Sequence, residues 1–269
     1  MAKTILLTGA TDGIGLETAK MLVSAGHEVL LHGRNPNKLK DVEQALKQMG
    51  GAGKVHCYEA DLSRMAEVDA LAKAVAENHA KLDALINNAG ILKMANPITD
   101  DGLDVRFVVN TLAPYWLTKR LLPLLGSSGR VINLSSAAQA PVDLAALAGQ
   151  RRLDDMAAYA QSKLAITMWS QHLAKAEEGN GPVIIAVNPG SLLGSKMVRE
   201  GFGVAGGDLS VGATILTRAA LDDDFAAASG KYFDNDQGRF ASPHPDALVP
   251  EKVESVVQAI EDLLAKFVH

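Results

Sequence analysis

Cysteine is nearly absent from this chain, and its absence excludes two kinds of structural site. The 269 residues contain a single cysteine, Cys57, so neither an internal disulfide nor a cysteine metal cage can form. The seven histidines show no spacing typical of metal ligands, and we predict no metal. Cys57 lies in a short run that predicts a strand, where we expect it to be an inert core residue.

Excess positive charge and long apolar runs are also absent. The net charge is −5, which argues against a nucleic-acid partner, because such proteins need a basic surface. No apolar run approaches the roughly 18 residues of a membrane span. The run Ile5-Leu6-Leu7 is followed at once by polar, glycine-rich sequence, so we expect no signal peptide. These absences predict a cytoplasmic protein with neither a nucleic-acid nor a membrane partner.

Short apolar runs alternate with longer amphipathic stretches along the whole chain, in which 48% of residues are apolar. Runs that are apolar without alternation predict strands buried on both faces, as in a parallel sheet covered by helices. The pattern predicts an α/β fold, a doubly wound (Rossmann) sheet of about seven strands with helices on both faces, formed as one domain over residues 1–269. The predicted strands are residues 4–7, 28–31, 55–58, 84–87, 131–134, 183–187 and 231–233.

A glycine-rich segment, TGATDGIG at residues 8–15, follows the first predicted strand and leads into an amphipathic helix. Glycines allow a tight turn and a close approach of the backbone to a pyrophosphate. The helix N-terminus adds free N–H groups and the positive end of a dipole. An ordinary strand-to-helix turn is the alternative, but the strand before it and the helix after it favour a dinucleotide site.

Tyr159 and Lys163 are four residues apart in a predicted helix, and therefore share one of its faces. A free tyrosine titrates near ~10, and a nearby cation lowers that pKa. A phenol held in this way can exchange protons near neutral pH, as a general acid or base requires. The spacing alone is common, and a solvated helix pair is the alternative. The glycine-rich segment and the pair Ser135-Ser136 upstream favour a catalytic site.

The spacing G-x3-G-x-G after Thr8 resembles that of the short-chain dehydrogenase/reductase family. Further motifs of that family follow in order over nearly the whole chain, and segments 188–193 and 230–233 resemble its retinol-dehydrogenase-like and WW-domain-oxidoreductase-like branch. The ordered motifs are Asp61-Leu62, Asn87-Asn88-Ala89-Gly90, Asn110, Ser135-Ser136, Tyr159 with Lys163, and Pro189-Gly190.

The resemblance implies an enzyme acting on CH–OH groups, which interconverts an aldehyde or ketone and an alcohol by hydride transfer. It maps a catalytic tetrad onto Ser136, Tyr159, Lys163 and Asn110. Tyr159 then acts as general acid and base, Ser136 holds the reacting oxygen, and Lys163 lowers the tyrosine pKa and binds the nicotinamide ribose. Ser136 is preferred over Ser135 as the catalytic serine, because its distance from the first residue of the strand matches that of the family's serine. Ser135 would then be the last residue of the strand.

Asn110 lies in a helix predicted over residues 103–122, four residues before Pro114. Because proline has no N–H group, the Asn110 carbonyl loses its usual helical donor. That carbonyl could bind a water that reaches Lys163 and completes a proton relay. A simple proline kink is the alternative.

The predicted cofactor is NADP(H), with NAD(H) less favoured. In the family, NAD-binding members usually carry an acidic residue where the second strand ends, and this strand ends in His32-Gly33-Arg34-Asn35. A guanidinium complements a 2′-phosphate, although a solvated arginine is the alternative. The resemblance also implies a set of cofactor contacts, in which Ser195 lies one residue further from Pro189 than in the family's usual pattern. These contacts are Gly9, Thr11, Asp12, Gly13, Ile14, Gly15, Arg34, Asn35, Asp61, Leu62, Asn88, Ala89, Gly90, Tyr159, Lys163, Pro189, Gly190, Leu192 and Ser195.

The substrate is predicted to be a small, apolar carbonyl compound or alcohol. A substrate loop or lid is expected around residues 191–230, with the glycine-rich segment 201–207 as its mobile part. The segment 143–153 lengthens the distance between Ser136 and Tyr159, and either borders the pocket or is a structural insertion. The apolar residues that form the lid, or else pack between helices, are Leu192, Leu193, Met197, Val198 and Phe202.

Two other functions share these motifs. A regulatory protein that senses NADPH without turnover is one, although a pure sensor needs no Tyr/Lys pair. An enoyl reductase is the other, but such short-chain relatives have a longer Tyr-to-Lys spacing. The resemblance also implies a homo-oligomer, a dimer or tetramer, usually formed through two long helices that here correspond to residues 103–122 and 155–175.

Overall fold

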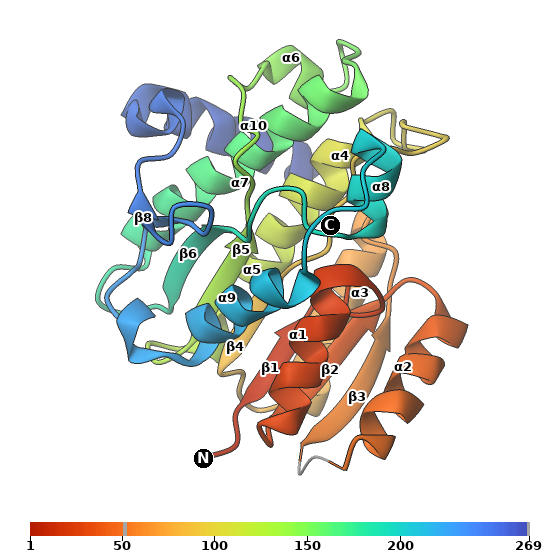
Figure 1. Ribbon diagram of the computed structural model, residues 1–269. Helices are drawn as coiled ribbons and strands as arrows, with labels where there is room; N and C mark the ends of the chain where they lie inside the picture. Colours follow the sequence, from red (N-terminus) through yellow and green to blue (C-terminus); the bar gives the residue numbers. More distant parts are fainter. Residues whose placement is uncertain (51–52, 268–269) are drawn as a thin grey trace.

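The computed structural model describes residues 1–50 and 53–267 (Figure 1). In these ranges an eight-stranded sheet has the order β3-β2-β1-β4-β5-β6-β7-β8. Strands β1 to β7 pair in parallel, and β8 pairs antiparallel to β7. The strands are β1 (Thr4–Leu7), β2 (Glu28–Gly33), β3 (Lys54–Glu59), β4 (Ala84–Asn87), β5 (Arg130–Leu134), β6 (Val183–Asn188), β7 (Tyr232–Asp234) and β8 (Arg239–Ala241).

Helices connect the strands and follow the last of them. They are α1 (Gly13–Ser24), α2 (Pro36–Gln48), α3 (Met65–Asn78), α4 (Val105–Phe107), η1 (Val108–Leu112), α5 (Ala113–Leu125), α6 (Leu144–Leu147), α7 (Asp155–Ala176), α8 (Lys196–Phe202), α9 (Leu209–Leu221), η2 (Asp223–Phe225), η3 (Pro245–Leu248) and α10 (Pro250–Phe267). The doubly wound fold predicted from the sequence is confirmed, and β8 is a short addition at one edge of the sheet.

The sheet separates two apolar cores, because successive side chains of a strand point to opposite faces. Ile5 and Leu7 face one core together with α1, α2 and α9, whereas Leu6 faces the other together with α3, α5, α7 and α10. Figure 1 shows α1 and α9 side by side across one face of the sheet. Burying one such side chain contributes about 2 kcal/mol, so many strand positions together hold the loops at the strand ends in place.

Strand β3 forms the free edge of the sheet, and its side chains are at most half-buried. Cys57 is exposed there, so the prediction that it is a core residue was wrong. An edge strand lacks a neighbour on one side, and the order of strands in the sheet cannot be seen from a short apolar run.

The helix predicted over 103–122 is divided into α4, η1 and α5. Asp104 caps α4, and the hydrogen bonding then widens to a π-helical turn in which the Ala113 N–H donates to the Val108 carbonyl. Pro114 follows at once and lacks the N–H that an α-helix would use. The proline therefore coincides with a local change of helix type at Asn110, as is common for π-helical turns near functional residues.

Helix α10 covers the outer side of α7. Its apolar side chains, Val256 and Ile260 among them, belong to the core that contains α7. At the same contact the Tyr115 hydroxyl of α5 donates to a Glu261 carboxylate oxygen over 2.6 Å. Residues 161–170 of α7 are all buried, with β6 and η1 as well as α10 packed against this helix. Within the described ranges, no helix combines the length and the apolar character needed to cross a membrane.

Candidate active site

The predicted site residues gather at one end of the sheet, where the neighbouring strands β1 and β4 lead into loops that diverge (Figure 1). The glycine-rich segment follows β1, Asn88 to Gly90 follow β4, Ser135 and Ser136 follow β5, and Pro189 and Gly190 follow β6. The carboxyl ends of parallel strands at such a switch in strand order are where open α/β sheets bind ligands.

The backbone of the glycine-rich segment leaves donors free at the start of α1. Gly9 and Gly13 have φ values of +66° and +55°, in the left-handed region that glycine adopts readily. Asp12 caps the helix by accepting from the Gly13 N–H over 2.7 Å. The next two N–H groups, of Ile14 and Gly15, have no hydrogen-bond partner among the described residues. The segment therefore fits the pyrophosphate of a dinucleotide.

Gly15 must be glycine for a packing reason as well. A Cβ atom added there would lie 2.2 Å from the Gly9 carbonyl oxygen and 2.5 Å from Asn88 Nδ2. The Asn88 amide in turn donates to the carbonyls of Thr8 and Gly9 over 2.8 and 3.0 Å, and the Ala89 N–H donates to the Thr8 hydroxyl. The loops after β1 and β4 are thereby joined into one rigid wall.

His32 is a structural residue of this site that sequence reasoning missed. Its Nδ1 accepts from the Gly9 N–H over 3.3 Å, and its Nε2 lies 3.0 Å from the Ala60 carbonyl. Burial lowers its pKa to about 4, so the ring is neutral at pH 7 and carries its proton on Nε2. His32 thus ties the glycine-rich segment to the end of β3. Its only sequence signal is a polar residue at the end of an apolar strand.

The end expected to hold adenosine carries Arg34, a cation. Arg34 is exposed and forms no ion pair within residues 1–50 and 53–267. Asn35 caps α2 by accepting from the Lys38 N–H, so this predicted cofactor contact also has a structural role. Across the opening, Asp61 Oδ1 accepts from the N–H and hydroxyl of Ser63, while Leu62 is buried. Free Arg34 donors fit the charge of a 2′-phosphate.

Lys163 and Tyr159 come from the same face of α7 and point into the site. Lys163 is 4% exposed, and its Nζ donates to the Leu134 carbonyl over 2.7 Å. Burial lowers the pKa of this ammonium to about 8. Its Nζ lies 5.6 Å from the centre of the Tyr159 ring. A buried ammonium with a single acceptor among the described residues has donors left for a ligand, such as ribose hydroxyls.

The pKa of Tyr159 is raised and not lowered. Burial of the phenol is the largest cause, and a hydrogen bond with the Ser136 side chain opposes it. The expectation of a lowered pKa was wrong for the geometry described, because desolvation of the phenolate outweighs the attraction of the ammonium.

The structure places the two neighbouring serines differently. The Ser135 hydroxyl is buried and bonds to the Thr167 hydroxyl over 2.7 Å and the Lys163 carbonyl over 3.2 Å. Ser136 is half-buried, its hydroxyl accepts from the Ala138 N–H, and its side chain is close enough to the Tyr159 phenol to oppose the rise of that pKa. Ser135 therefore anchors the strand end to α7, and Ser136 is the serine that reaches the tyrosine.

Asn110 lies beside the Tyr/Lys pair and fixes the loop after β4. Its Oδ1 accepts from the Ile91 N–H, and its Nδ2 donates to the Ile91 carbonyl and to the Ser162 hydroxyl. A Cβ added at Gly90 would lie 3.4 Å from Lys163 Nζ and 3.5 Å from Asn110 Oδ1. Gly90 thus occupies the narrow space between these two side chains. The water bound to the Asn110 carbonyl stays a prediction.

A second group of residues, which sequence reasoning did not predict, holds the backbone of Ser136 in place. The Ser136 carbonyl accepts from the Tyr232 hydroxyl over 3.1 Å and from Gln139 Nε2 over 2.9 Å. Gln139 Oε1 accepts in turn from the His244 N–H. Tyr232 and His244 are about a hundred positions away in the chain, so no local pattern links them to the serine. The one available signal is a tyrosine in the middle of a predicted strand.

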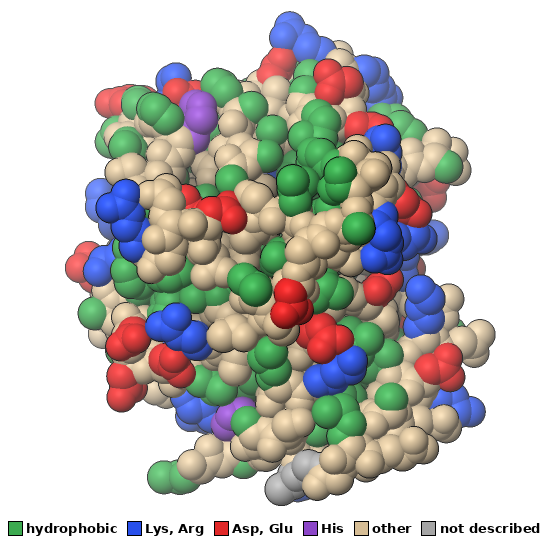
Figure 2. All heavy atoms as spheres, viewed as in Figure 1, with side chains coloured by type: hydrophobic (Ala, Val, Ile, Leu, Met, Phe, Trp, Pro, Cys, Tyr) green, Lys and Arg blue, Asp and Glu red, His purple; other side chains and the backbone are tan. Residues whose placement is uncertain are grey.

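The expected apolar lid divides into packed and open residues. Leu193 and Val198 are buried, whereas Leu192 and Phe202 are 47% and 44% exposed. Met197 lies near Gly90, where its Cε would be 3.8 Å from an added Cβ. Figure 2 shows hydrophobic side chains gathered on the surface beside α8.

Ser195 and the glycine-rich segment 201–207 lie on either side of α8, at its start and at its end. Ser195 caps α8 by accepting from the Val198 N–H, and its Cβ lies 3.5 Å from where a Gly13 Cβ would be. Gly201 belongs to α8, so the expected loop 201–207 begins two residues later, at the left-handed Gly203. Its mobility stays a prediction.

The insertion at 143–153 is packed against the rest of the chain. Asp143 caps α6, and its N–H donates to Gln161 Oε1 of α7. Ala146 and Leu147 are buried, and α6 packs on α10. These contacts favour the structural interpretation of the insertion.

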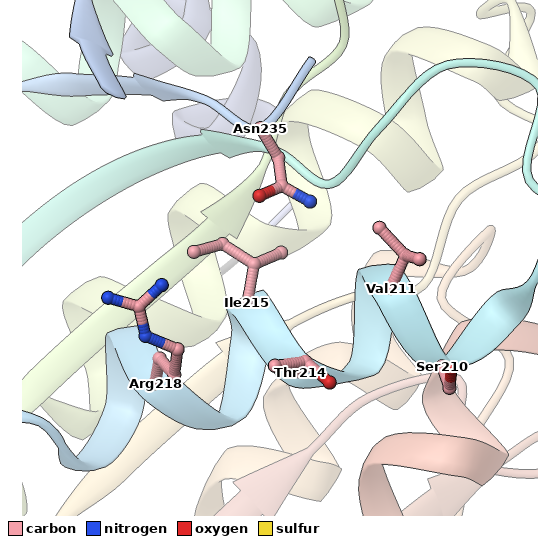
Figure 3. Close-up of a pocket in the computed structure, with 6 residues that line it drawn as sticks. All are labelled: Ser210, Val211, Thr214, Ile215, Arg218 and Asn235. Carbon is pink, nitrogen blue, oxygen red and sulfur yellow. The ribbon is translucent and has the colours of Figure 1, made fainter. Parts of the chain in front are cut away.

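A hollow of about 280 Å³ lies outside the predicted site, between α9 and the turn after β7 (Figure 3). Asn235 points into it toward Val211 and Ile215 of α9. The Asn235 side chain also donates to the Pro189 carbonyl over 2.9 Å. None of the predicted catalytic residues lines this hollow, but its wall is continuous with the loop after β6.

Comparison with known proteins agrees with this geometry. The family described as short chain dehydrogenase matches residues 3–202. Retinol dehydrogenase 13 of Homo sapiens is 33% identical over 267 residues, 91% of this chain and 79% of that protein. Among solved structures, an uncharacterized protein from Mycobacterium paratuberculosis has a TM-score of 0.80 at 27% identity, covering 97% of this chain and 92% of that chain. The Pseudomonas aeruginosa RhlG/NADP active-site complex has a TM-score of 0.71 at 26% identity, covering 88% and 96%.

The fold and these matches define an oxidoreductase with a Rossmann-type sheet and a nicotinamide cofactor. The chain belongs to the short-chain dehydrogenase/reductase family, in its retinol-dehydrogenase-like branch. The family and fold predicted from the sequence are confirmed.

Proposed function

We propose that this chain is an NADP(H)-dependent oxidoreductase that interconverts an apolar aldehyde or ketone and the corresponding alcohol. The observation that carries the proposal is the arrangement around Lys163, a buried ammonium with one acceptor in the described part of the chain, 5.6 Å from the ring of Tyr159. The Ser136 side chain lies next to the same tyrosine, and N–H groups of α1 that have no partner among the described residues open at the same end of the sheet. Such a constellation suits proton transfer beside a bound dinucleotide.

The residues of the site divide the work of carbonyl reduction. The nicotinamide supplies the hydride when the cofactor is bound. Tyr159 donates its phenolic proton to the carbonyl oxygen as charge develops there, and the Ser136 hydroxyl holds that oxygen by a hydrogen bond. Lys163 holds the ribose hydroxyls, and its charge favours the phenolate left behind on Tyr159. Asn110 keeps the loop of Gly90 in place beside Lys163.

The preference for NADP(H) rests on Arg34. Its exposed guanidinium has no acidic partner in the described part of the chain, and no carboxylate ends β2. A 2′-phosphate would supply the missing counter-charge through two parallel hydrogen bonds. The similar RhlG structure is a complex with NADP, in agreement with this choice.

The apolar substrate class rests on the surface beside α8. Leu192 and Phe202 are exposed at the loop that follows the predicted nicotinamide contacts, and Met197 faces Gly90. The relative retinol dehydrogenase 13 is named for an apolar alcohol. We place the substrate lid in residues 191–230 and treat the whole chain as one cofactor-binding domain.

Self-association remains part of the proposal, although α10 covers one of the two helices expected at the interface. Helices α5 and α7 were expected to face a symmetry mate, whereas α10 of the same chain covers α7 and pairs Glu261 with Tyr115 and Lys119 of α5. Light scattering measures the oligomeric state, and deletion of α10 should expose the covered apolar face and raise the apparent mass. The cytoplasm stays our predicted location, to be checked by cell fractionation.

The test of the function is the oxidation of NADPH in the presence of apolar aldehydes and ketones. Wild-type protein should turn over, and Tyr159→Phe should bind NADPH without turnover. Tight binding of NADPH by the wild type with no turnover across a broad panel would favour the regulatory alternative instead.

A further inference from the structure

The turn between β7 and β8 contacts the loop that follows β6. Asp236 lies in this turn, and both of its carboxylate oxygens bond to the loop. Oδ1 accepts from the Ser191 N–H over 2.8 Å, and Oδ2 accepts from the Ser191 hydroxyl over 2.6 Å and from Asn188 Nδ2 over 2.9 Å. Asp236 is exposed, yet both of its carboxylate oxygens accept hydrogen bonds from residues 188–191.

Neighbours of Asp236 strengthen the same contact. Asp234 accepts from Asn188 Nδ2 over 2.9 Å, and Asn235 donates to the Pro189 carbonyl and, through its backbone, to the Asn188 carbonyl. Burial raises the pKa of the Asp236 carboxyl, but the hydrogen bonds from Ser191 and Asn188 outweigh it and hold the pKa below its ordinary value. Asp236 is therefore a carboxylate at neutral pH, and its bonds to the loop are charge-assisted.

The loop held by this turn carries backbone strain. Leu192 has φ at +52°, which a leucine adopts only when its surroundings impose it, and Gly190 has φ at +123°. The Leu192 carbonyl accepts from the Gly207 N–H over 2.8 Å on the side away from the turn. Leu192 is thus held on both sides. Asp236 binds the residue before it, Ser191, and the Gly207 N–H binds its own carbonyl.

We propose that Asp236 is a positioning residue, which through Ser191 and Asn188 holds the Pro189–Gly190 loop in the conformation that receives the nicotinamide half of the cofactor. The inference rests on the proposed function, in which this loop borders the nicotinamide. The Asp236 carboxylate bonds to Ser191 and Asn188 and is not itself one of the predicted catalytic or cofactor-binding groups. Without its carboxylate the loop loses three hydrogen bonds and Leu192 can relax, while the adenosine end at Arg34 and Asp61 is unaffected.

Binding of the whole cofactor and of its adenosine half separates this role from general stability. For Asp236→Ala, the Kd of NADPH should rise about tenfold, roughly the effect of one charge-assisted hydrogen bond. The Kd of 2′,5′-ADP, which lacks the nicotinamide half, should not change. Asp236→Asn keeps one acceptor oxygen and should lie between wild type and Asp236→Ala. Arg239→Ala, just after the turn and with side-chain bonds to Gln237 alone among the described residues, is the matched control and should bind both ligands as the wild type does.

The same variants give a kinetic readout. Looser nicotinamide placement slows hydride transfer, so the kcat of Asp236→Ala should fall and the deuterium isotope effect with 4-deuterated NADPH should rise. If Asp236→Ala does not fold, Ser191→Ala removes one of the three bonds from the other side and should shift NADPH affinity alone, by a few-fold. Folded Asp236→Ala with wild-type affinity for NADPH, or with equal losses for NADPH and 2′,5′-ADP, would overturn the proposal.

Failure of the positioning role can be told apart from failure of the proposed function. A wild type that binds NADPH but reduces no carbonyl contradicts the function, and the comparison of NADPH with 2′,5′-ADP still decides the role of Asp236. A wild type that turns over while Asp236→Ala behaves like Arg239→Ala contradicts the positioning role alone. A wild type that binds no nicotinamide cofactor contradicts both.

Discussion

Replacing Lys163 by methionine tests the desolvated ammonium at the centre of the site. Lys163 is 4% exposed, and burial lowers its pKa from 10.5 to about 8. One pKa unit corresponds to about 1.4 kcal/mol, so the buried charge destabilises the folded protein at pH 7 by about 3 kcal/mol. Loss of the bond to the Leu134 carbonyl offsets about 1 kcal/mol of that. We expect Lys163→Met to raise the free energy of unfolding at pH 7 by about 2 kcal/mol while abolishing turnover.

The dependence on pH gives this prediction its sign. The folded pKa lies below the unfolded one, so the unfolded chain holds more protons between about pH 8 and pH 10.5, and the wild type gains stability as pH rises through that window. The variant lacks this titration. Its advantage over the wild type should therefore shrink by about 2 kcal/mol between about pH 7 and pH 9.5.

Urea unfolding across this pH range measures the difference between the two proteins. Lys175→Met, which changes an exposed lysine of the same helix, is the control and should show no such trend. A difference between Lys163→Met and wild type that stays constant with pH would refute the claim that the ammonium is held away from water.

Three further substitutions probe the cofactor wall and the serine. Arg34→Asp should weaken NADPH binding by about 10- to 100-fold and leave NADH binding nearly unchanged in a fluorescence titration, because only NADPH loses charge-assisted bonds. Gly15→Ala should lower the free energy of unfolding by about 1–3 kcal/mol, because its Cβ would lie 2.2 Å from the Gly9 carbonyl oxygen; a wild-type melting curve would show that the wall is not rigid. Tyr232→Phe removes one donor from the Ser136 carbonyl, and should lower kcat several-fold with the KM for NADPH unchanged; an equal change in both would contradict a role at Ser136.

The parts of the fold predicted from the sequence are those with a local signal. The seven apolar runs predicted the parallel strands because a strand buried on both faces needs such a run. Strand β8 has three residues, of which two are exposed, and it forms only because the turn ending at the left-handed Gly238 brings it back to β7. Cys57 was misplaced because the position of β3 at the sheet edge depends on strand order.

The parts of the candidate site that were predictable are also those with a local signal in the sequence. The glycine-rich segment and the Tyr159/Lys163 spacing are local, and the structure brings them together at one end of the sheet. The direction of the Tyr159 pKa was not predictable, because it depends on burial by the whole fold and not on spacing in one helix. His32, Tyr232 and Asp236 act through partners distant in sequence, and α10 covers a helix about a hundred residues before it, so these contacts exist only once the chain has folded.

The most direct test of the proposed function is the rate of NADPH oxidation by wild type and Tyr159→Phe with apolar aldehydes and ketones. The site predicts turnover by the wild type and a rate at least about 100-fold lower in the variant, with equal Kd for NADPH, because only the proton donor is removed. A variant that keeps the wild-type rate would contradict the assignment of Tyr159 as the general acid.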